Sequence, residues 1–230
     1  FPHYLASVPE DLQTALQPLH QFLQKQQQLE QKKLAKALQS ARYQRLVVNW
    51  RKFLESPVLQ RTTAANANRP IIELANERTW KMYKRVMKEG NAINVESPPE
   101  DLHEMRKSCK KLRYLLEFFH NLYDSEKISI LVKALKQLQN NLGDYQDLHV
   151  QIESLKHFSE LMSKDTPPPP LTLLAMGTLI ENLDRRQLDV RQEFYQRFEA
   201  FSLPKFQQLF RQLFNPIDEA KRSNEDIANQ

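Results

Sequence analysis

Basic side chains recur at helical spacing between Leu102 and Phe119, where the sequence reads LHEMRKSCKKLRYLLEFF. At about 100° per residue, a helix over this stretch would carry His103, Arg106, Lys110, Arg113 and Glu117 on one face, with Lys107 and Tyr114 beside them. The opposite face would carry Met105, Cys109, Leu112, Leu116 and Phe119. Ammonium, guanidinium and imidazole groups in such a row are suited to binding successive phosphates. Because Glu117 follows Arg113 by four residues, we expect these two to pair.

Three further segments carry basic rows of this kind. One has Arg78, Lys81, Arg85 and Lys88 with Lys84 beside them; another has Lys133, Lys136, Asn140, Asp144 and Asp147, opposite Leu131, Leu135, Leu138 and Leu142. The earliest segment has two neighbouring rows, formed by Lys32, Lys36, Gln39 and Tyr43 and by Arg42, Arg45, Asn49 and Lys52. If these rows converge, they line a groove or channel whose like charges repel one another until a polyanion neutralises them.

The positive charge is concentrated in one part of the chain. Residues 31–92 hold fourteen Lys or Arg against four Asp or Glu, whereas the rest of the chain holds nineteen against twenty-four. Such a segment attracts nucleic acid, acidic membrane surfaces or phosphate polymers. A solvated helix face is the plainer explanation of the same charge. Between residues 185 and 197, where arginines alternate with acidic residues, we expect only a salt-bridged solvent surface.

Glycine and cysteine usage excludes several kinds of site. The chain has three glycines, Gly90, Gly143 and Gly177, where average usage would give roughly sixteen. Phosphate-cradling loops and dinucleotide fingerprints need glycines close together, so we do not expect a sheet-based nucleotide enzyme. The single cysteine, Cys109, allows no intramolecular disulfide. We expect a cytoplasmic protein with no cofactor and no metal.

The composition favours an all-α fold of antiparallel long-helix bundles, because Leu, Gln, Lys, Glu and Ala dominate. Proline positions and apolar spacing predict helices over residues 10–28, 31–56, 70–93, 98–123, 127–163, 171–202 and 204–214. The longest apolar stretch, residues 171–180, is about half of a membrane span. We therefore expect no membrane partner.

Two motifs together resemble the CHAD family, the conserved-histidine α-helical domains. The first is H-x-x-R-K-x-x-K-K-L-R-Y-x-x-E from His103 to Glu117, and the second is L-x-x-L-Q-x-x-L-G-x-x-x-D from Leu135 to Asp147. The resemblance implies two pseudo-symmetric helical bundles, a basic cavity that binds inorganic polyphosphate, and no established catalysis. It also implies a triphosphate-processing domain or protein as a partner, although the acidic strand motif of that domain is absent from this sequence.

The resemblance extends to individual residues of the two motifs. It places His103, Arg106, Lys110, Arg113 and Tyr114 on the basic helix; it places Gln139, Leu142, Gly143 and Asp147 on the helix beside it. Gly143 would allow close approach of the two helices, and Asp147 would orient nearby basic groups. Gln146 stands where the family usually has Asn.

The family's earlier copy of the histidine-arginine helix is absent from this sequence, which begins at Phe1 without methionine. We therefore expect an N-terminally incomplete member. Residues 1–57 would be the remainder of the first bundle, residues 58–215 a second bundle with the basic cavity, and residues 216–230 a frayed polar tail. Missing sequence or a second chain, as in a homodimer, would complete the cavity.

These observations lead to the hypothesis of a non-enzymatic polyphosphate-binding module, located in the cytoplasm or at polyphosphate granules. The expected binding residues are Lys36, Arg42, Arg45, Arg78, Lys81, Arg85, Lys88, His103, Arg106, Lys107, Lys110, Arg113, Tyr114, Lys133 and Lys136. One alternative is a helical scaffold that binds nucleic acid, because aromatic residues are interleaved with the basic ones. A second is a metal-dependent phosphohydrolase that uses His103 and nearby carboxylates, although no nucleophile with a base is recognisable.

Overall fold

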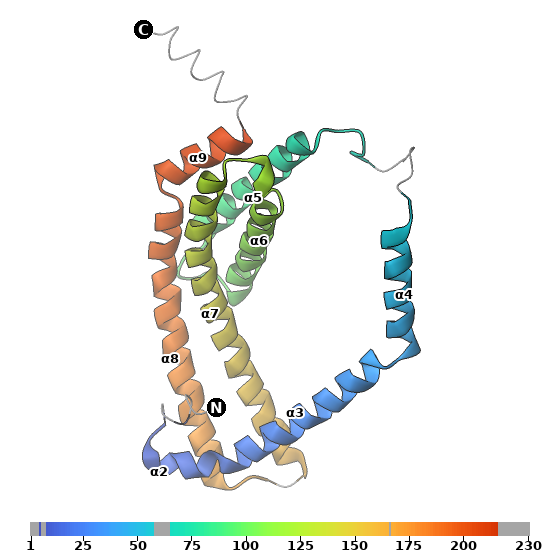
Figure 1. Ribbon diagram of the computed structural model, residues 1–230. Coiled ribbons are helices and arrows are strands. Elements are labelled where there is room, and N and C mark those ends of the chain that lie inside the picture. Colours follow the sequence, from blue (N-terminus) through green and yellow to red (C-terminus); the bar gives the residue numbers. More distant parts are fainter. Residues whose placement is uncertain (1–4, 6–7, 58–64, 166, 216–230) are drawn as a thin grey trace. The chain divides into compact units, whose positions relative to one another are not determined.

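The computed structural model describes Leu5 and residues 8–57, 65–165 and 167–215. Its regular elements over these residues are all helical, which confirms the expected fold class (Figure 1). Within the same residues, every helix is too short or too polar to cross a bilayer. The expected frayed tail, residues 216–230, lies outside the described part of the chain.

Prolines mark most helix starts, as the sequence predicts. In chain order the elements are α2 (Glu10–Gln13), the 3-10 turn η1 (Thr14–Leu16), α3 (Gln17–Leu38), α4 (Ala41–Glu55), α5 (Ile71–Ala92), α6 (Pro99–Phe118), the 3-10 turn η2 (His120–Leu122), α7 (Ser125–Asp165), α8 (Pro170–Phe201) and α9 (Pro204–Phe214). Pro70 directly precedes α5, and α6, α8 and α9 each begin at a proline. A proline suits the first helical turn because its missing N–H would have had no partner there.

The predicted helix break near residues 28–31 is wrong. Helix α3 runs through these positions, since they hold only strong helix formers. The break lies at Gln39 and Ser40 instead. The Ser40 hydroxyl accepts a hydrogen bond from the Tyr43 backbone N–H at 3.3 Å and donates one to the Ala37 carbonyl at 2.6 Å, which caps α4. The predicted row from Lys32 to Tyr43 is therefore divided between two helices.

The predicted helix over residues 98–123 is shorter than expected. Helix α6 ends at Phe118, and η2 follows it. The Tyr123 hydroxyl donates a hydrogen bond to Asn76 Oδ1 at 2.7 Å. The ring centres of Tyr123 and Phe214 are 4.8 Å apart. Contacts with residues distant in the chain therefore stabilise this turn. Asp124 then accepts a hydrogen bond from the Lys127 backbone N–H at 3.0 Å. This is the N-cap that starts α7 before the predicted residue 127.

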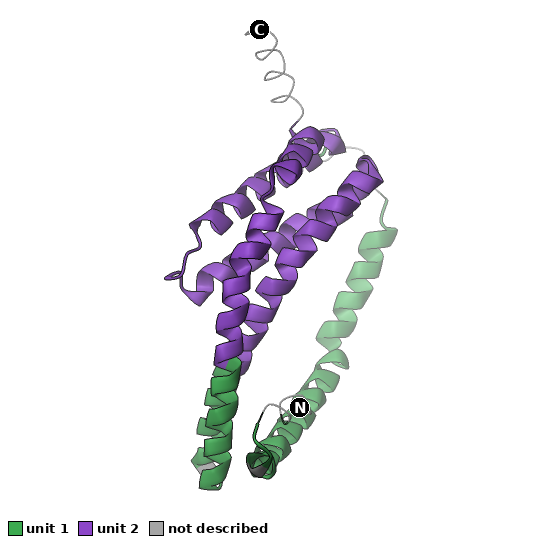
Figure 2. Cartoon of the chain, turned by 90° about the vertical axis from the view of Figure 1, so that its left-hand side faces the viewer, with its two compact units in different colours: residues 1–67, 152–183 green, residues 68–151, 184–230 purple. Residues whose placement is uncertain are grey.

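Two compact units make up the chain (Figure 2). Unit 1 comprises residues 1–67 and 152–183, and unit 2 comprises residues 68–151 and 184–230. Helices α7 and α8 therefore contribute to both units. The bundle boundaries expected from the sequence, at residues 57 and 58, stay a prediction.

Unit 2 has a continuous apolar core built by α5, α6, α9 and parts of α7 and α8. The predicted apolar face of α6 is confirmed, because Met105, Cys109, Leu112 and Leu116 are buried, while Phe119 is half-buried. The apolar row of α7 is buried as well. Five phenylalanines from α8 and α9 fill the rest of the core: Phe194, Phe198, Phe201, Phe210 and Phe214. This core fixes the helices whose outer faces carry the basic rows.

Packing that leaves no room for a side chain occurs at Gly90, against the Phe198 ring, and not at Gly143 as expected. A Cβ atom on Gly90 would lie 2.1 Å from Cε2 of Phe198, which no side chain tolerates without a shift. A Cβ on Gly143 would meet only the Arg106 Nε at 4.0 Å, an ordinary contact. The sequence prediction for Gly143 is therefore wrong, because a Cβ atom has room at this position.

The expectation of a salt-bridged surface over residues 185–197 holds for only part of that stretch. Arg197 pairs with Glu193 at 3.5 Å. Arg191 instead donates through Nη2 to the backbone carbonyls of Asn94 and Val95, each at 3.1 Å, and of Ser97. These carbonyls lie in the connection between α5 and α6, where no helix supplies partners for them. Arg191 thus holds a loop in place.

Among the described residues, fewer side chains are buried in unit 1 than in unit 2. Leu16 and Leu19 are fully buried, and the ring of Phe22 on α3 contacts that of Phe158 on α7 at 5.7 Å. Every residue of α4 is exposed, including Trp50 and Phe53, whose rings stack on each other at 5.6 Å.

Candidate functional site

The basic row of α6 lies along its seam with α7. His103 Nδ1 is 2.8 Å from Gln146 Oε1. Because an amide oxygen can only accept, the ring donates from Nδ1, and its Nε2 remains available to another partner. Gln146, the position at which the resemblance predicts Asn, is thus the partner of His103. Three residues further along α6, the Arg106 side chain lies over Gly143 of α7.

These two contacts set the antiparallel register of α6 and α7. Continuing it by one helical turn brings Lys110 level with Gln139, and one turn more brings Arg113 level with Lys136. Both amide atoms of Gln139 are buried without a hydrogen-bond partner among the described residues. The seam therefore carries cations from two helices beside an unsatisfied buried amide.

The predicted pairing of Arg113 with Glu117 is confirmed. Arg113 Nε lies 3.5 Å from Glu117 Oε1. The two side chains form an ion pair but no hydrogen bond at this distance. The buried Nε has no hydrogen-bond partner among the described residues. The guanidinium also lies over the ring of Tyr114, with Cζ 5.4 Å from the ring centre. Glu117 and Tyr114 together restrict the positions that Arg113 can take.

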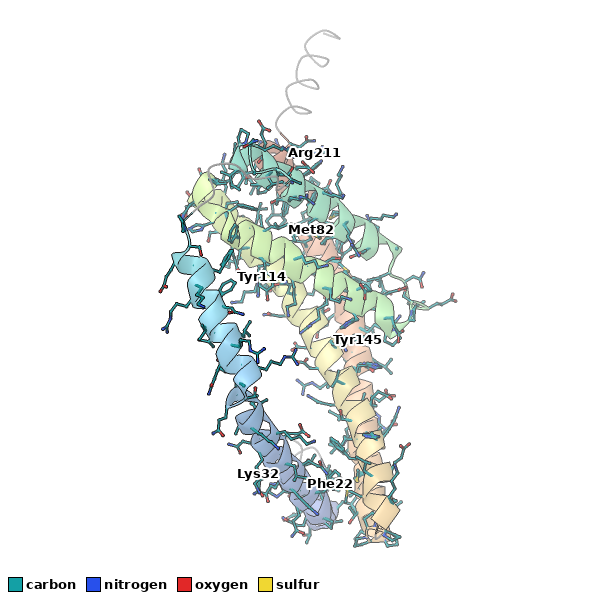
Figure 3. All side chains as sticks on the ribbon, turned by 90° about the vertical axis from the view of Figure 1, so that its right-hand side faces the viewer. Phe22, Lys32, Met82, Tyr114, Tyr145 and Arg211 are labelled. Atoms are coloured by element: carbon teal, nitrogen blue, oxygen red, sulfur yellow. The ribbon has the colours of Figure 1, made fainter. Side chains whose placement is uncertain are left out.

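Helices α5 and α6 pack against each other and form an open groove of about 590 Å³. Its apolar and aromatic lining consists of Met82 and Leu115, which are half-buried, and Tyr114 and Phe118, which are exposed. Met82 and Tyr114 are labelled in Figure 3. Four cations also line it: Arg78, Lys81 and Arg85 from α5 and Lys111 from α6. The groove thus combines apolar and aromatic surface with a dense group of positive charges.

Some cations of this region have acidic partners. Arg85 Nε donates to Glu89 Oε1 at 2.6 Å, and this hydrogen bond raises the pKa of Arg85. Lys107 Nζ donates a hydrogen bond to Glu104 Oε1 at 2.6 Å, and this bond lowers the pKa of Glu104. Burial acts in the opposite direction, while the charges of Lys107, His103 and Arg85 lower the pKa further. Within the described part of the chain, Arg78, Lys81 and Lys111 form no ion pair. These three are the side chains best able to receive an anion.

The other predicted residues lie elsewhere in the two units. Lys88 and Lys136 are exposed on α5 and α7. Lys133 lines a different groove, of about 360 Å³, together with Arg197 and Lys205 from α8 and α9. In unit 1, Lys36 is exposed on α3. Arg42 and Arg45 line a groove of about 580 Å³ where α3 meets α4.

Sequence reasoning missed Lys111 and Phe118 as groove residues. The signal was present, because Lys107, Lys111, Tyr114 and Phe118 form a second row on α6 at helical spacing. It also missed Lys205, which follows a proline and belongs to none of the rows. Asp144 and Asp147 are exposed on α7. Across the described residues, no three His, Cys, Asp or Glu side chains are grouped so that they could hold a metal ion.

Comparison with known proteins gives one family. The family model described as the CHAD domain matches residues 1–156, which include α2 to α6 and most of α7. Helices α8 and α9 lie beyond the matched residues. A search of curated proteins finds no match to this chain.

Proposed function

Since the chain belongs to the CHAD domain family, we propose that it binds inorganic polyphosphate along the basic rows of unit 2 and does not hydrolyse it. The observation that carries the proposal is the group of cations on α5 and α6 that form no ion pair among the described residues, Arg78, Lys81 and Lys111. Three like charges that line one groove repel one another, and a polyanion bound there relieves that repulsion.

The α6–α7 seam supports the same function. Its register brings Lys136 level with Arg113. Gln146 is bonded to Nδ1 of His103, and no hydrogen bond among the described residues engages Nε2. A phosphate chain could contact Arg106, Lys110 and Arg113 in succession, since these residues project from one face of α6. Arginine can bind phosphate oxygens through two N–H groups at once, which adds strength and orientation. Release of counterions from the polymer contributes the remainder of the affinity.

A competition titration tests the proposal. Long-chain polyphosphate carrying a fluorescent label is bound to the protein, and unlabelled polyphosphate, duplex DNA or single-stranded DNA is added at equal phosphate concentration. The proposal predicts displacement by polyphosphate at much lower phosphate concentration than by either DNA. Equal displacement by single-stranded DNA would instead support the nucleic-acid scaffold, which the exposed Tyr114 and Phe118 favour.

Absence of catalysis is tested separately. The protein is incubated with polyphosphate and Mg²⁺ or Mn²⁺, and released phosphate is measured over several hours. We expect no more phosphate than in the control without protein. Sustained release that is lost in His103→Ala would refute the non-enzymatic function and support the phosphohydrolase alternative.

A further inference from the structure

The groove between α5 and α6 has a chemistry that inorganic polyphosphate does not use. A phosphate polymer has no apolar surface, yet Met82 and Leu115 line this groove and two exposed rings border it. Phe118 is 79% exposed and Tyr114 is 52% exposed. These two rings lie with Met82 and Leu115 in one groove, and apolar side chains that are exposed together mark a surface that a ligand or partner covers. The groove volume, about 590 Å³, is within the range of small-molecule sites.

We propose that the α5–α6 groove binds a nucleoside polyphosphate, with the base against Tyr114 and Phe118 and the phosphates on the surrounding cations. Tyr114 and Phe118 lie four residues apart on α6 and therefore share one face. Lys111 is on the same side of α6, while Arg78, Lys81 and Arg85 come from α5. The inference rests on the proposed phosphate-binding function and adds a ligand class to it.

Charge balance favours a nucleotide over single-stranded nucleic acid in this groove. Four cations line the same groove as one aromatic pair, and three of them form no ion pair among the described residues. A nucleic acid strand brings one phosphate for each base, whereas a nucleoside triphosphate brings three phosphates with a single base. The triphosphate therefore satisfies the rings and the cations together.

Phe118 can be changed without disturbing the core. Its ring makes an edge contact with Phe119 at 4.9 Å, and most of its surface faces solvent. Phe118→Ala removes the ring, and Phe118→Leu keeps an apolar side chain without a flat aromatic face. Tyr114→Phe keeps the ring and removes only the hydroxyl. These three variants separate base stacking from general apolar contact and from hydrogen bonding.

Isothermal titration of the whole chain with ATP and with inorganic tripolyphosphate, without divalent cation, tests the inference. The two probes carry similar charge, and only ATP carries a base. We expect ATP to bind more tightly than tripolyphosphate to the unchanged protein. We expect Phe118→Ala to weaken ATP binding by about 5- to 30-fold, as loss of a stacking platform does. Phe118→Leu should weaken it nearly as much, and Tyr114→Phe should not. Tripolyphosphate binding should be unchanged in both Phe118 variants.

The possible failures are distinguishable. Equal affinities for ATP and tripolyphosphate, with no effect of Phe118→Ala on either, would refute the inference and leave the polyphosphate function standing. Full retention of ATP binding in Phe118→Leu would refute stacking as its basis. Failure of long-chain polyphosphate to bind would refute the proposed function, even if ATP binding that depends on Phe118 were found.

Discussion

Replacing Gly90 and Gly143 by alanine should change the stability of unit 2 in opposite directions. Both residues lie inside helices, where alanine is more favourable than glycine by about 1 kcal/mol. At Gly143 the new Cβ would meet only Arg106 Nε at 4.0 Å, so Gly143→Ala should gain most of this amount.

At Gly90 the same methyl group would overlap a buried ring. The new Cβ would lie 2.1, 2.4 and 2.6 Å from three ring atoms of Phe198. Ordinary contact begins near 3.4 Å, so the ring must move by more than 1 Å. The Phe198 ring cannot move freely, because it is buried and stacks on Phe194 with ring centres 5.9 Å apart. Overpacking of this kind costs about 1–3 kcal/mol, which exceeds the gain in helix propensity.

Urea unfolding followed by circular dichroism measures both effects. We expect the free energy of unfolding to fall by up to about 2 kcal/mol in Gly90→Ala and to rise by up to about 1 kcal/mol in Gly143→Ala. In a Phe198→Leu background the loss caused by Gly90→Ala should shrink, because the clashing ring is gone. The reasoning fails if Gly90→Ala stabilises the protein as much as Gly143→Ala does.

Two further predictions concern stability. Arg191→Ala should lower the free energy of unfolding by about 1–3 kcal/mol, because the carbonyls of Asn94, Val95 and Ser97 lose a donor. The control is Arg186→Ala, at an exposed position of α8. Equal effects of the two changes would contradict the role of Arg191. Burial raises the pKa of Tyr83 to about 12. The unfolded chain therefore loses this proton first as the pH rises, so the free energy of unfolding should decrease between about pH 10 and 12. Tyr83→Phe should reduce that decrease, and an unchanged pH profile would contradict the assignment.

The local features of the fold were predictable from the sequence. Proline positions and apolar spacing give the starts of α5, α6, α8 and α9 and the buried faces of α6 and α7, because both depend on residues close in the chain. The break at Ser40 also had a local signal, since serine is a strong N-cap residue. Overlooking it joined Lys36 and Arg42 into one expected helix.

Features set by distant residues were not predictable in this way. The role of Gly90 depends on Phe198, and that of Arg191 depends on a loop more than ninety residues away. The basic row of α6 and the helix beside it were predictable, but the contact of His103 with Gln146 follows only from the register of two packed helices. The groove that holds Lys111 likewise requires two helices to be placed side by side.

The central claim is that basic rows from different helices of unit 2 act together on a polyphosphate chain. Its most direct test compares two double variants that change net charge equally. Lys81→Glu with Lys136→Glu removes exposed cations from α5 and α7, and Lys127→Glu with Arg186→Glu removes exposed cations outside these rows. The affinity for long-chain polyphosphate is measured at several salt concentrations.

The first double variant should bind polyphosphate more weakly, and the slope of log affinity against log salt should become shallower by about 1.5, since two phosphate contacts are lost. The second should keep both the affinity and the slope of the unchanged protein. Equal losses in both double variants would contradict the claim, because binding would then depend on net charge and not on the basic rows.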